Sequence, residues 1–441
     1  YPYLWEVKYA QQNIGFSLKA DSSSNIQSAQ SNVKSTKVQI QNKRFFKNLS
    51  DLELSWQLLI NGQVIKSGDG ITLSAEAQST EIITIPVVGN QQNPKEQLLN
   101  LQARLVTAQN LLPEGHIVAS EQIPLTEWLM PQAALEKGAN RLSYTNNKEG
   151  IRLAGKDFEF VISEKTGLIT SMVFAGNEVL SSNVEKPVHP NFWRAPTDND
   201  FPQKGYGDQF GVWQHAGTTT ELTSINVEKV SSQNTKITVE HYIPAVESRY
   251  FTTYDVHGNG TIDVDVYFYA APHKRSAYLP RIGTQFVFNK DYEQVTWYGR
   301  GPHENYIDRR SSAFVGLYQT TVAELEVSYV RPQENGHRSD IRFLSFVNGE
   351  GNGVKFTGLP LFAFNASYFD MHEFDSSELQ MSRRNMHPTD LTKQDHIFVN
   401  IDYAQRGVGG IDSWGAKPLY EYTLPWLDYR YQYRIEPVTK E

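Results

Sequence analysis

The chain of 441 residues contains no cysteine. It therefore has no disulfide, no zinc site built from thiolates and no cysteine nucleophile. The absence of cysteine does not indicate a cellular compartment. It also has no run of about 18 apolar residues, so membrane insertion is not expected. The formal net charge of −8 comes from dispersed acidic and basic residues, without the basic face that nucleic acids or anionic membranes require. Neither kind of partner is expected.

Turn-forming and aromatic residues are plentiful instead, with 30 Gly, 20 Pro, 23 Tyr and 22 Phe. This profile favours many strands joined by tight turns. Apolar and polar residues alternate over short segments, and Trp56, Leu58 and Ile60 lie on one face before an Asn61-Gly62 hairpin turn. About six or seven such strands predict an immunoglobulin-like β-sandwich domain over residues 1–125.

Residues 126–140 are predicted to be a linker, and residues 141–441 a second all-β domain. The alternation continues there, and Asn259-Gly260 is another hairpin signal. A unit of this size is too large for one ordinary sandwich, so it predicts a large two-sheet β-supersandwich. Helical patterns are scarce, and Asn305–Phe314 and Ser376–Arg383 are the two short candidates.

The segment from Phe192 to Asp200 reads Phe-Trp-Arg-Ala-Pro-Thr-Asp-Asn-Asp. Arginine and carboxylates bind sugar hydroxyls, so Arg194, Asp198 and Asp200 are candidate substrate ligands. Two alternatives stay open: a hard cation bound by the acidic residues, and a structural turn whose Asx side chains cap their own backbone. The aromatic pair, Phe192 and Trp193, is interpreted as a core anchor for the loop.

Three further segments gather polar residues: Trp297–Tyr306, Arg331–Arg338 and Gly409–Gly415. The first two supply groups that could hold a sugar on a concave sheet face, namely His303, Glu304, Glu334, His337 and Arg338. A buried network of satisfied hydrogen bonds needs the same residue types. The structural network is the favoured interpretation of this cluster.

Together the four segments resemble the carboxy-terminal domain of the large bacterial β-galactosidases of glycoside hydrolase family 2. The segment Leu4–Tyr9 with Gln12-Asn13-Ile14 is similar to the one that follows that family's catalytic barrel, so the resemblance covers the whole chain. It implies a galactose-mutarotase-like supersandwich for residues 141–441. It also implies that the intact enzyme hydrolyses terminal β-D-galactosides with retention.

The resemblance further implies which parts this chain lacks. Both catalytic glutamates of the family stand on the barrel, and no segment here matches their motifs, so no catalytic residue is assigned and the chain alone is expected to be inactive. Its expected partners are a galactoside or other sugar and the barrel of the same polypeptide. No cofactor is assigned to this chain and any metal ligand is unknown, while the intact enzyme is expected to use a divalent cation, Mg²⁺ or Ca²⁺. We expect a soluble protein of the bacterial cytoplasm or periplasm.

Trp414 lies in the glycine-rich run that begins Gly409-Gly410-Ile411-Asp412. In the family, the tryptophan of this motif reaches the active site and stacks on the sugar, so Trp414 is expected to contact substrate. The alternative is a tryptophan that plugs the edge of its own sandwich. A different class of function also stays open, a stand-alone carbohydrate-binding protein or an aldose 1-epimerase-like enzyme, which would need an acid and base pair such as His with Glu.

Overall fold

The computed structural model describes residues 1–19, 35–89, 95–130, 140–147, 150–200, 210–273, 278–375, 385–410, 412 and 416–440. These residues form two compact units. The N-terminal unit comprises Tyr3–Leu129 with Phe314–Leu317, and the C-terminal unit comprises Tyr1–Pro2, Met130–Ala313 and Tyr318–Glu441. Most of the proposed linker, residues 131–139, lies outside the described residues, so the domain boundaries stay a prediction.

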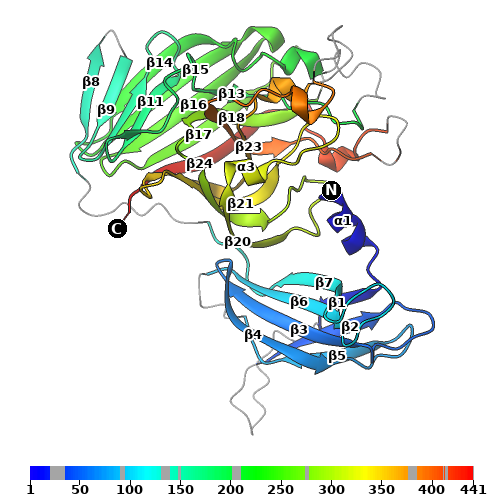
Figure 1. The fold of residues 1–441 in the computed structure, drawn as a ribbon. Helices are drawn as coiled ribbons and strands as arrows, with labels where there is room; N and C mark the ends of the chain where they lie inside the picture. The colour runs from blue at the N-terminus through cyan, green and yellow to red at the C-terminus, as the bar shows by residue number, and fades with distance from the viewer. Residues whose placement is uncertain are drawn as a thin grey trace. The chain divides into compact units, whose positions relative to one another are not determined.

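The described residues of the N-terminal unit form one short helix and two antiparallel sheets. Its elements are α1 (Tyr3–Ala10), β1 (Ile14–Leu18), β2 (Thr36–Asn42), β3 (Leu52–Ile60), β4 (Gln63–Thr72), β5 (Thr80–Ile85), β6 (Gln97–Leu105) and β7 (Ile117–Pro124). The described strands pair in the orders β1-β2-β5 and β4-β3-β6-β7 (Figure 1). Helix α1 was not predicted from the sequence, and none of its residues is buried.

Apolar side chains from both sheets form one buried cluster, which includes Ile40 of β2, Trp56 of β3 and Leu101 of β6. This common core confirms the predicted sandwich. The predicted hairpin joins β3 to β4, and Asn61 and Gly62 adopt φ values of 48° and 80°. Positive φ at both central residues matches the right-handed twist of the flanking strands, which explains the choice of Asn and Gly.

The C-terminal unit is built almost wholly from strands. They are β8 (Ser143–Asn147), β9 (Gly150–Ala154), β10 (Phe158–Ile162), β11 (Ile169–Phe174), β12 (Asn177–Glu178), β13 (Val188–Asn191), β14 (Glu221–Lys229), β15 (Asn234–Ile243), β16 (Ser248–His257), β17 (Ile262–Tyr269), β18 (Arg281–Asn289), β19 (Gln294–Gly301), β20 (Phe314–Thr321, whose first four residues are assigned to the N-terminal unit), β21 (Arg338–Val347), β22 (Gly353–Ser367), β23 (His396–Gln405) and β24 (Tyr429–Val438). The helical elements are short: α3 (Val322–Leu325) and the 3₁₀ helices η2 (Gly211–Trp213), η3 (Pro244–Val246), η4 (Met371–Phe374), η5 (Pro388–Asp390) and η6 (Tyr420–Tyr422).

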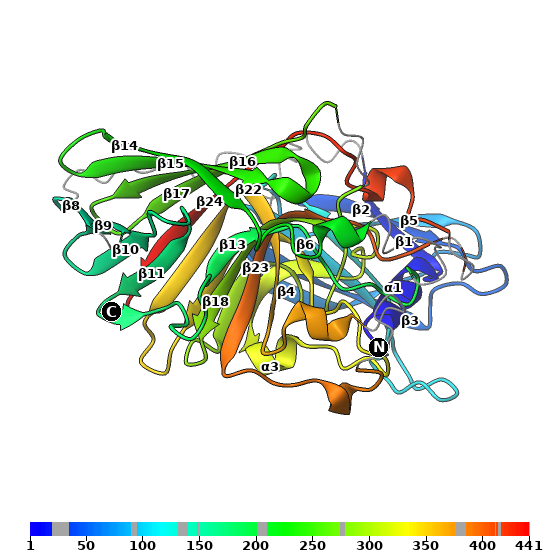
Figure 2. The same cartoon turned by 90° about the horizontal axis from the view of Figure 1, so that it is seen from above.

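The described strands form a five-stranded sheet, β12-β11-β10-β9-β8, and a 12-stranded sheet. The main path of the larger sheet runs β13-β18-β23-β22-β24-β17-β16-β15-β14. Figures 1 and 2 show β8 to β11 beside the β14–β17 end of this sheet. The two sheets share one apolar core, in which the rings of Phe160 and Tyr254 lie 5.6 Å apart. The all-β fold class is therefore confirmed.

The helix expected over Asn305–Phe314 is not present. Tyr306 and Arg309 instead exchange two backbone hydrogen bonds of 3.0 and 2.8 Å, which closes a tight turn, and strand β20 begins at Phe314. The polar side chains of this segment bind neighbouring loops rather than lining one helical face. The other helix candidate, Ser376–Arg383, lies outside the described residues.

Trp213 is fully buried, and its ring lies 5.5 Å from Phe192 and 5.7 Å from Trp426. Removing a buried tryptophan loses its contacts and leaves a cavity. We expect Trp213→Ala to lower the free energy of unfolding of the C-terminal unit by about 3–5 kcal/mol, measured by urea denaturation. The control Trp5→Ala removes a ring that is 56% exposed and should change it by less than about 0.5 kcal/mol. Equal losses in both variants would contradict the core assignment.

Candidate functional site

The segment 192–200 follows β13 and enters the interior at both ends. Phe192 and Trp193 are buried, as the sequence predicts for core anchors. At the other end, Asp200 accepts hydrogen bonds from the backbone nitrogen and Oγ1 of Thr197, at 2.8 and 3.0 Å. This is the capped turn that the sequence offered as the structural alternative.

Asp200 also lies between two buried arginines. Its Oδ2 accepts from Arg194 Nη1 at 2.7 Å, and its Oδ1 accepts from Arg406 Nη1 at 2.8 Å. Burial on its own would raise the pKa of Asp200, but the two guanidinium groups and the Thr197 amide outweigh it and hold that pKa below its ordinary value. Arg194 and Asp200 therefore bind each other inside the protein.

Asp198 differs from these two because its side chain is 59% exposed. Its Oδ2 accepts from Gln333 Nε2 at 3.2 Å, and Arg331 lies 3.8 Å from its Oδ1. Of the three candidate sugar ligands in this segment, Asp198 is the one whose carboxylate meets solvent. The contacts also join the segment 192–200 to the segment 331–338.

A second buried ion group surrounds Arg281 of β18. Its Nη2 lies 3.1 Å from Glu334 Oε1, and its Nε lies 3.2 Å from Asp402 Oδ2. The Asp402 contact lacks hydrogen-bond geometry, and neither oxygen of Asp402 has a hydrogen-bond partner within the described ranges. Burial raises the pKa of Asp402 to about 7 against the pull of Arg281, with Glu334 adding to the rise. Burial also raises the pKa of Glu334 against the pull of Arg281.

The predicted concave-face cluster lies largely inside the fold. Glu304 accepts from Arg309 at 2.7 Å, from the Gly336 nitrogen at 2.8 Å and from the hydroxyl of Tyr329. Arg338 donates to backbone carbonyls, including Leu325 at 3.1 Å. These contacts are those of a structural hydrogen-bond network, the favoured interpretation.

The two histidines of the cluster are placed differently. His337 is buried and stacks on Tyr306, with ring centroids 5.0 Å apart. His303 lies 3.0 Å from Ser312 through its Nε2 and is half-buried. A role in sugar binding for any member of the cluster stays a prediction.

Asp308 holds the segment that follows β23. Its Oδ1 accepts from the Val408 nitrogen at 3.2 Å and its Oδ2 from the Gly409 nitrogen at 2.7 Å. A Cβ on Gly407 would lie 2.5 Å from Asp308 Oδ2, so a larger residue there would displace the Asp308 carboxylate. Asn199 Nδ2 donates to the Val408 carbonyl at 3.0 Å, which ties the same segment to 192–200.

Contacts thus join segment 331–338 to segments 192–200 and 297–306, and Asn199 and Asp308 bind residues 408 and 409. Sequence reasoning missed Arg281, Asp308, Asp402 and Arg406. The signal for three of them was a charged residue at or near a strand end: Arg281 begins β18, and Asp402 and Arg406 lie near the end of β23. Trp414 itself lies outside the described residues, so nothing in the structure bears on its predicted stacking.

The Asp200 carboxylate is bound by two arginines of the protein. Asp200 is already bound by two guanidinium groups, a donor set that does not fit a metal ligand. Within the described parts of the chain, no group of three or more His, Cys, Asp or Glu side chains is placed to hold a metal ion. The cation alternative for residues 198–200 therefore has no support from these contacts.

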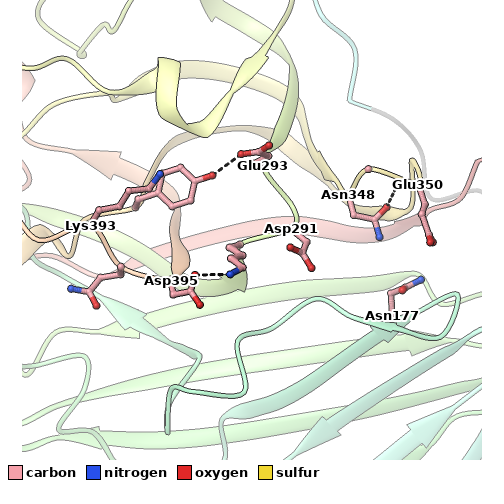
Figure 3. A pocket seen from close by; sticks show the side chains of 11 residues that line it. Asn177, Asp291, Glu293, Asn348, Glu350, Lys393 and Asp395 are labelled. Carbon is pink, nitrogen blue, oxygen red and sulfur yellow. Dashed lines mark hydrogen bonds and ion pairs between the residues drawn. The ribbon is translucent and has the colours of Figure 1, made fainter.

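A wide polar hollow of about 620 Å³ opens elsewhere in the C-terminal unit (Figure 3). Two contacts join side chains of its lining: Lys290 donates to Asp395 at 2.8 Å, and the Tyr368 hydroxyl donates to Glu293 at 2.9 Å. Lys393 Nζ covers one face of the Tyr368 ring, 3.9 Å from its centroid. We assign no ligand to this hollow.

Comparison with known families decides the relationship of the chain. The family described as beta galactosidase small chain matches residues 154–435, and beta-galactosidase domain 4 matches residues 38–126. The chain belongs to the β-galactosidase family. No helix in the described part of this family member is long and apolar enough to cross a membrane.

Relatives named β-galactosidase are longer than this chain. The one from Priestia megaterium is 30% identical over 88% of this chain and 36% of its own length. The one from Pseudoalteromonas haloplanktis is 29% identical over 98% of this chain and 40% of its own length. The chain therefore spans about two fifths of the relatives that it matches.

Among solved structures, the chain is similar to galactose 1-epimerase from Lactobacillus acidophilus, with a TM-score of 0.40 and 8% identity over 68% of this chain and 99% of that one. It is also similar to a glycoside hydrolase family 97 enzyme from Pseudoalteromonas, with a TM-score of 0.35 and 10% identity over 68% of this chain and 36% of that one. These scores are low, and no conclusion rests on them.

Removing the charge of Asp200 should leave two buried guanidinium groups without their anion. We expect Asp200→Asn to lower the free energy of unfolding by about 3–5 kcal/mol at pH 7. The pKa of Asp200 is lowered by folding, so its stabilisation is present above the unfolded pKa and is lost as pH falls through the folded pKa. The difference between variant and wild type should therefore shrink below about pH 4 in denaturant titrations at several pH values.

The matched control is Asp198→Asn, which changes the same residue type in the same loop at an exposed position. It should alter stability by less than about 0.5 kcal/mol. If Asp200→Asn behaved like Asp198→Asn at pH 7, the buried carboxylate would not be holding the arginines.

Proposed function

We propose that this chain is the carboxy-terminal portion of a β-galactosidase that hydrolyses terminal β-D-galactosides with retention. The catalytic barrel stands elsewhere in the same polypeptide, and this chain supplies the scaffold and the substrate-contacting loops. The proposal is supported by the two family matches and by relatives named β-galactosidase in which the matched region is 36–40% of the length.

Catalysis is assigned to the barrel because the carboxylates here are unsuited to it. Retaining hydrolysis needs two carboxyl groups roughly 5 Å apart with access to the sugar. Glu334 and Asp402 are near one another, but both are buried beside Arg281. Glu304 is also buried and already accepts three hydrogen bonds. A substrate cannot approach these groups.

The proposed role rests on two contacts, each of which holds one loop in place. Asp200 binds Arg406 at 2.8 Å, and Asp308 binds the Gly409 amide at 2.7 Å. The first contact anchors the loop that presents Asp198, and the second anchors the stem that leads to Trp414. A loop that must place a side chain against a sugar gains from a rigid base, because misplacement by about 1 Å weakens binding and catalysis.

In this proposal Asp198 accepts a hydrogen bond from a substrate hydroxyl, and Trp414 stacks on the apolar face of the galactose ring. Arg194 and Asp200 bind each other and hold the loop that presents Asp198 to the sugar. A divalent cation, Mg²⁺ or Ca²⁺, belongs to the proposal for the intact enzyme, with no ligand assigned on this chain.

The chain alone should not hydrolyse a chromogenic β-galactoside, because it lacks the barrel glutamates that form and break the covalent intermediate. The measurement is release of the chromophore by the purified chain over hours. Steady turnover that survives Glu304→Gln and Glu334→Gln would show a catalytic site elsewhere on the chain. Anomerisation of galactose above the buffer rate by the same sample would favour the epimerase alternative instead.

In the intact enzyme, Trp414→Ala should raise KM about tenfold with little change in melting temperature, because ring stacking contributes about 1 kcal/mol or somewhat more. Asp308→Ala should also raise KM, because the Val408 and Gly409 amides lose their acceptor. The control Asp395→Ala breaks a surface ion pair with Lys290 and should change neither value. An unchanged KM with a collapsed melting temperature for Trp414→Ala would place that ring in the core.

A further inference from the structure

Two loops at one end of the N-terminal unit carry large apolar side chains on the surface. In the loop between β2 and β3, Phe45 is 74% exposed and Phe46 is 100% exposed. In the loop between β6 and β7, Leu111 is 98% exposed. Single exposed apolar residues are common, but several of them at one end of a unit mark a surface that binds another protein segment. We name residues 43–51 and 106–115 the apolar loop pair.

Hydrogen bonds to Asp51 hold the two loops together. Its Oδ1 accepts from Arg44 Nη1 at 2.7 Å and its Oδ2 accepts from Lys47 Nζ at 2.8 Å, so the residues on both sides of the phenylalanine pair are fixed. The same Oδ2 accepts from Gln109 Nε2 at 3.0 Å, and the Asp51 carbonyl accepts from the Val106 nitrogen at 3.0 Å. The apolar side chains therefore project from an ordered base, and a surface that is ordered before it binds loses less entropy on binding.

The tip of the second loop is also constrained. Gln109 and Leu112 exchange two backbone hydrogen bonds of 2.9 Å each, which closes a two-residue turn around Asn110 and Leu111. Asn110 adopts a φ of 53°, in the left-handed region that Asn adopts more readily than most residues. Leu111 is therefore exposed at the tip of an ordered turn.

Helix α1 reaches the same end of the unit. The Lys43 nitrogen donates to the Asn13 carbonyl at 2.9 Å, and Lys8 Nζ lies 3.5 Å from His116 Nε2. None of the residues of α1 is buried, and Trp5 is 56% exposed. In the proposed enzyme the barrel precedes this chain, so the polypeptide enters the N-terminal unit through α1, beside the apolar loop pair.

We propose that the apolar loop pair is a docking surface for the barrel that precedes this chain in the same polypeptide. The inference rests on the proposed function, which supplies that barrel. The barrel is favoured over a second copy of the chain because its connection through α1 gives it a high effective concentration at this surface. Burial of each phenylalanine ring favours the docked state about tenfold or more.

The test is hydroxyl-radical footprinting, which oxidises side chains in proportion to their exposure. This chain of 441 residues is compared with the intact enzyme, each at low and at high protein concentration. We expect oxidation of Phe45 and Phe46 to fall severalfold in the intact enzyme at every concentration. The matched controls are Val64 and Ile65 of β4, which are 51% and 58% exposed and lie near the opposite end of β3. Their oxidation should be the same in both samples.

Substitution in the intact enzyme gives an independent measurement. Phe45→Ser combined with Phe46→Ser removes both exposed rings and leaves the core of the unit intact. Heat inactivation of galactoside hydrolysis should become about tenfold faster or more, because the docked state loses the burial of both rings. The control Val64→Thr combined with Ile65→Thr keeps β-branched side chains in the strand and should change that rate by about twofold at most.

An active enzyme in which Phe45 and Phe46 are oxidised as fast as in this chain would overturn the docking proposal alone. Equal protection of the β4 controls, or equal inactivation rates in the two double variants, would also overturn it. Protection that appears in this chain only at high concentration would assign the surface to a second copy instead. An intact polypeptide that hydrolyses no β-galactoside would overturn the proposed function.

Discussion

A single buried carboxylate, Asp200, sets how the loops of the C-terminal unit are held. Arg194 comes from the loop after β13, and Arg406 comes from the end of β23, 206 positions from Asp200 in the sequence. Both guanidinium groups are almost fully buried. Each would be strongly destabilising without its anion. The fold therefore keeps these segments together, and Asp308 and Asn199 extend the same fixation to residues 408 and 409.

Burying charges in this way favours specificity over stability. Desolvation of each ion is expensive, and apolar groups of the same volume often stabilise a protein as well or better. A planar guanidinium, however, binds a carboxylate in one orientation and so fixes direction as well as distance. Around Arg281 the charges are less well satisfied, because neither oxygen of Asp402 has a hydrogen-bond partner within the described residues, although Arg281 lies 3.2 Å away, and burial raises the pKa of Asp402 to about 7. The Asp402 oxygens can therefore still accept hydrogen bonds.

The fold was largely predictable because its signals are local. Alternation of apolar residues predicts strands, and Asn61, Gly62 and Gly260 occur where a hairpin turn needs positive φ. The helix predicted over residues 305–314 was wrong because polar side chains of this segment bind residues far away in the sequence. Asn305, for example, accepts hydrogen bonds from Ser339. The sequence also indicated the residue types of the site, but it did not indicate which residues bind one another. Nothing near Asp200 in the sequence reveals that Arg406 shares it.

Hydrogen exchange at the Val408 and Gly409 amides tests most directly whether buried ion pairs hold the loop stem. In the wild-type chain we predict that both amides are protected. Asp200→Asn should speed their exchange while the amides of β15 to β17 stay protected, because those strands pair with one another and not with this stem. Unchanged protection of Val408 and Gly409, or loss of protection throughout the sheet, would contradict the role assigned to Asp200.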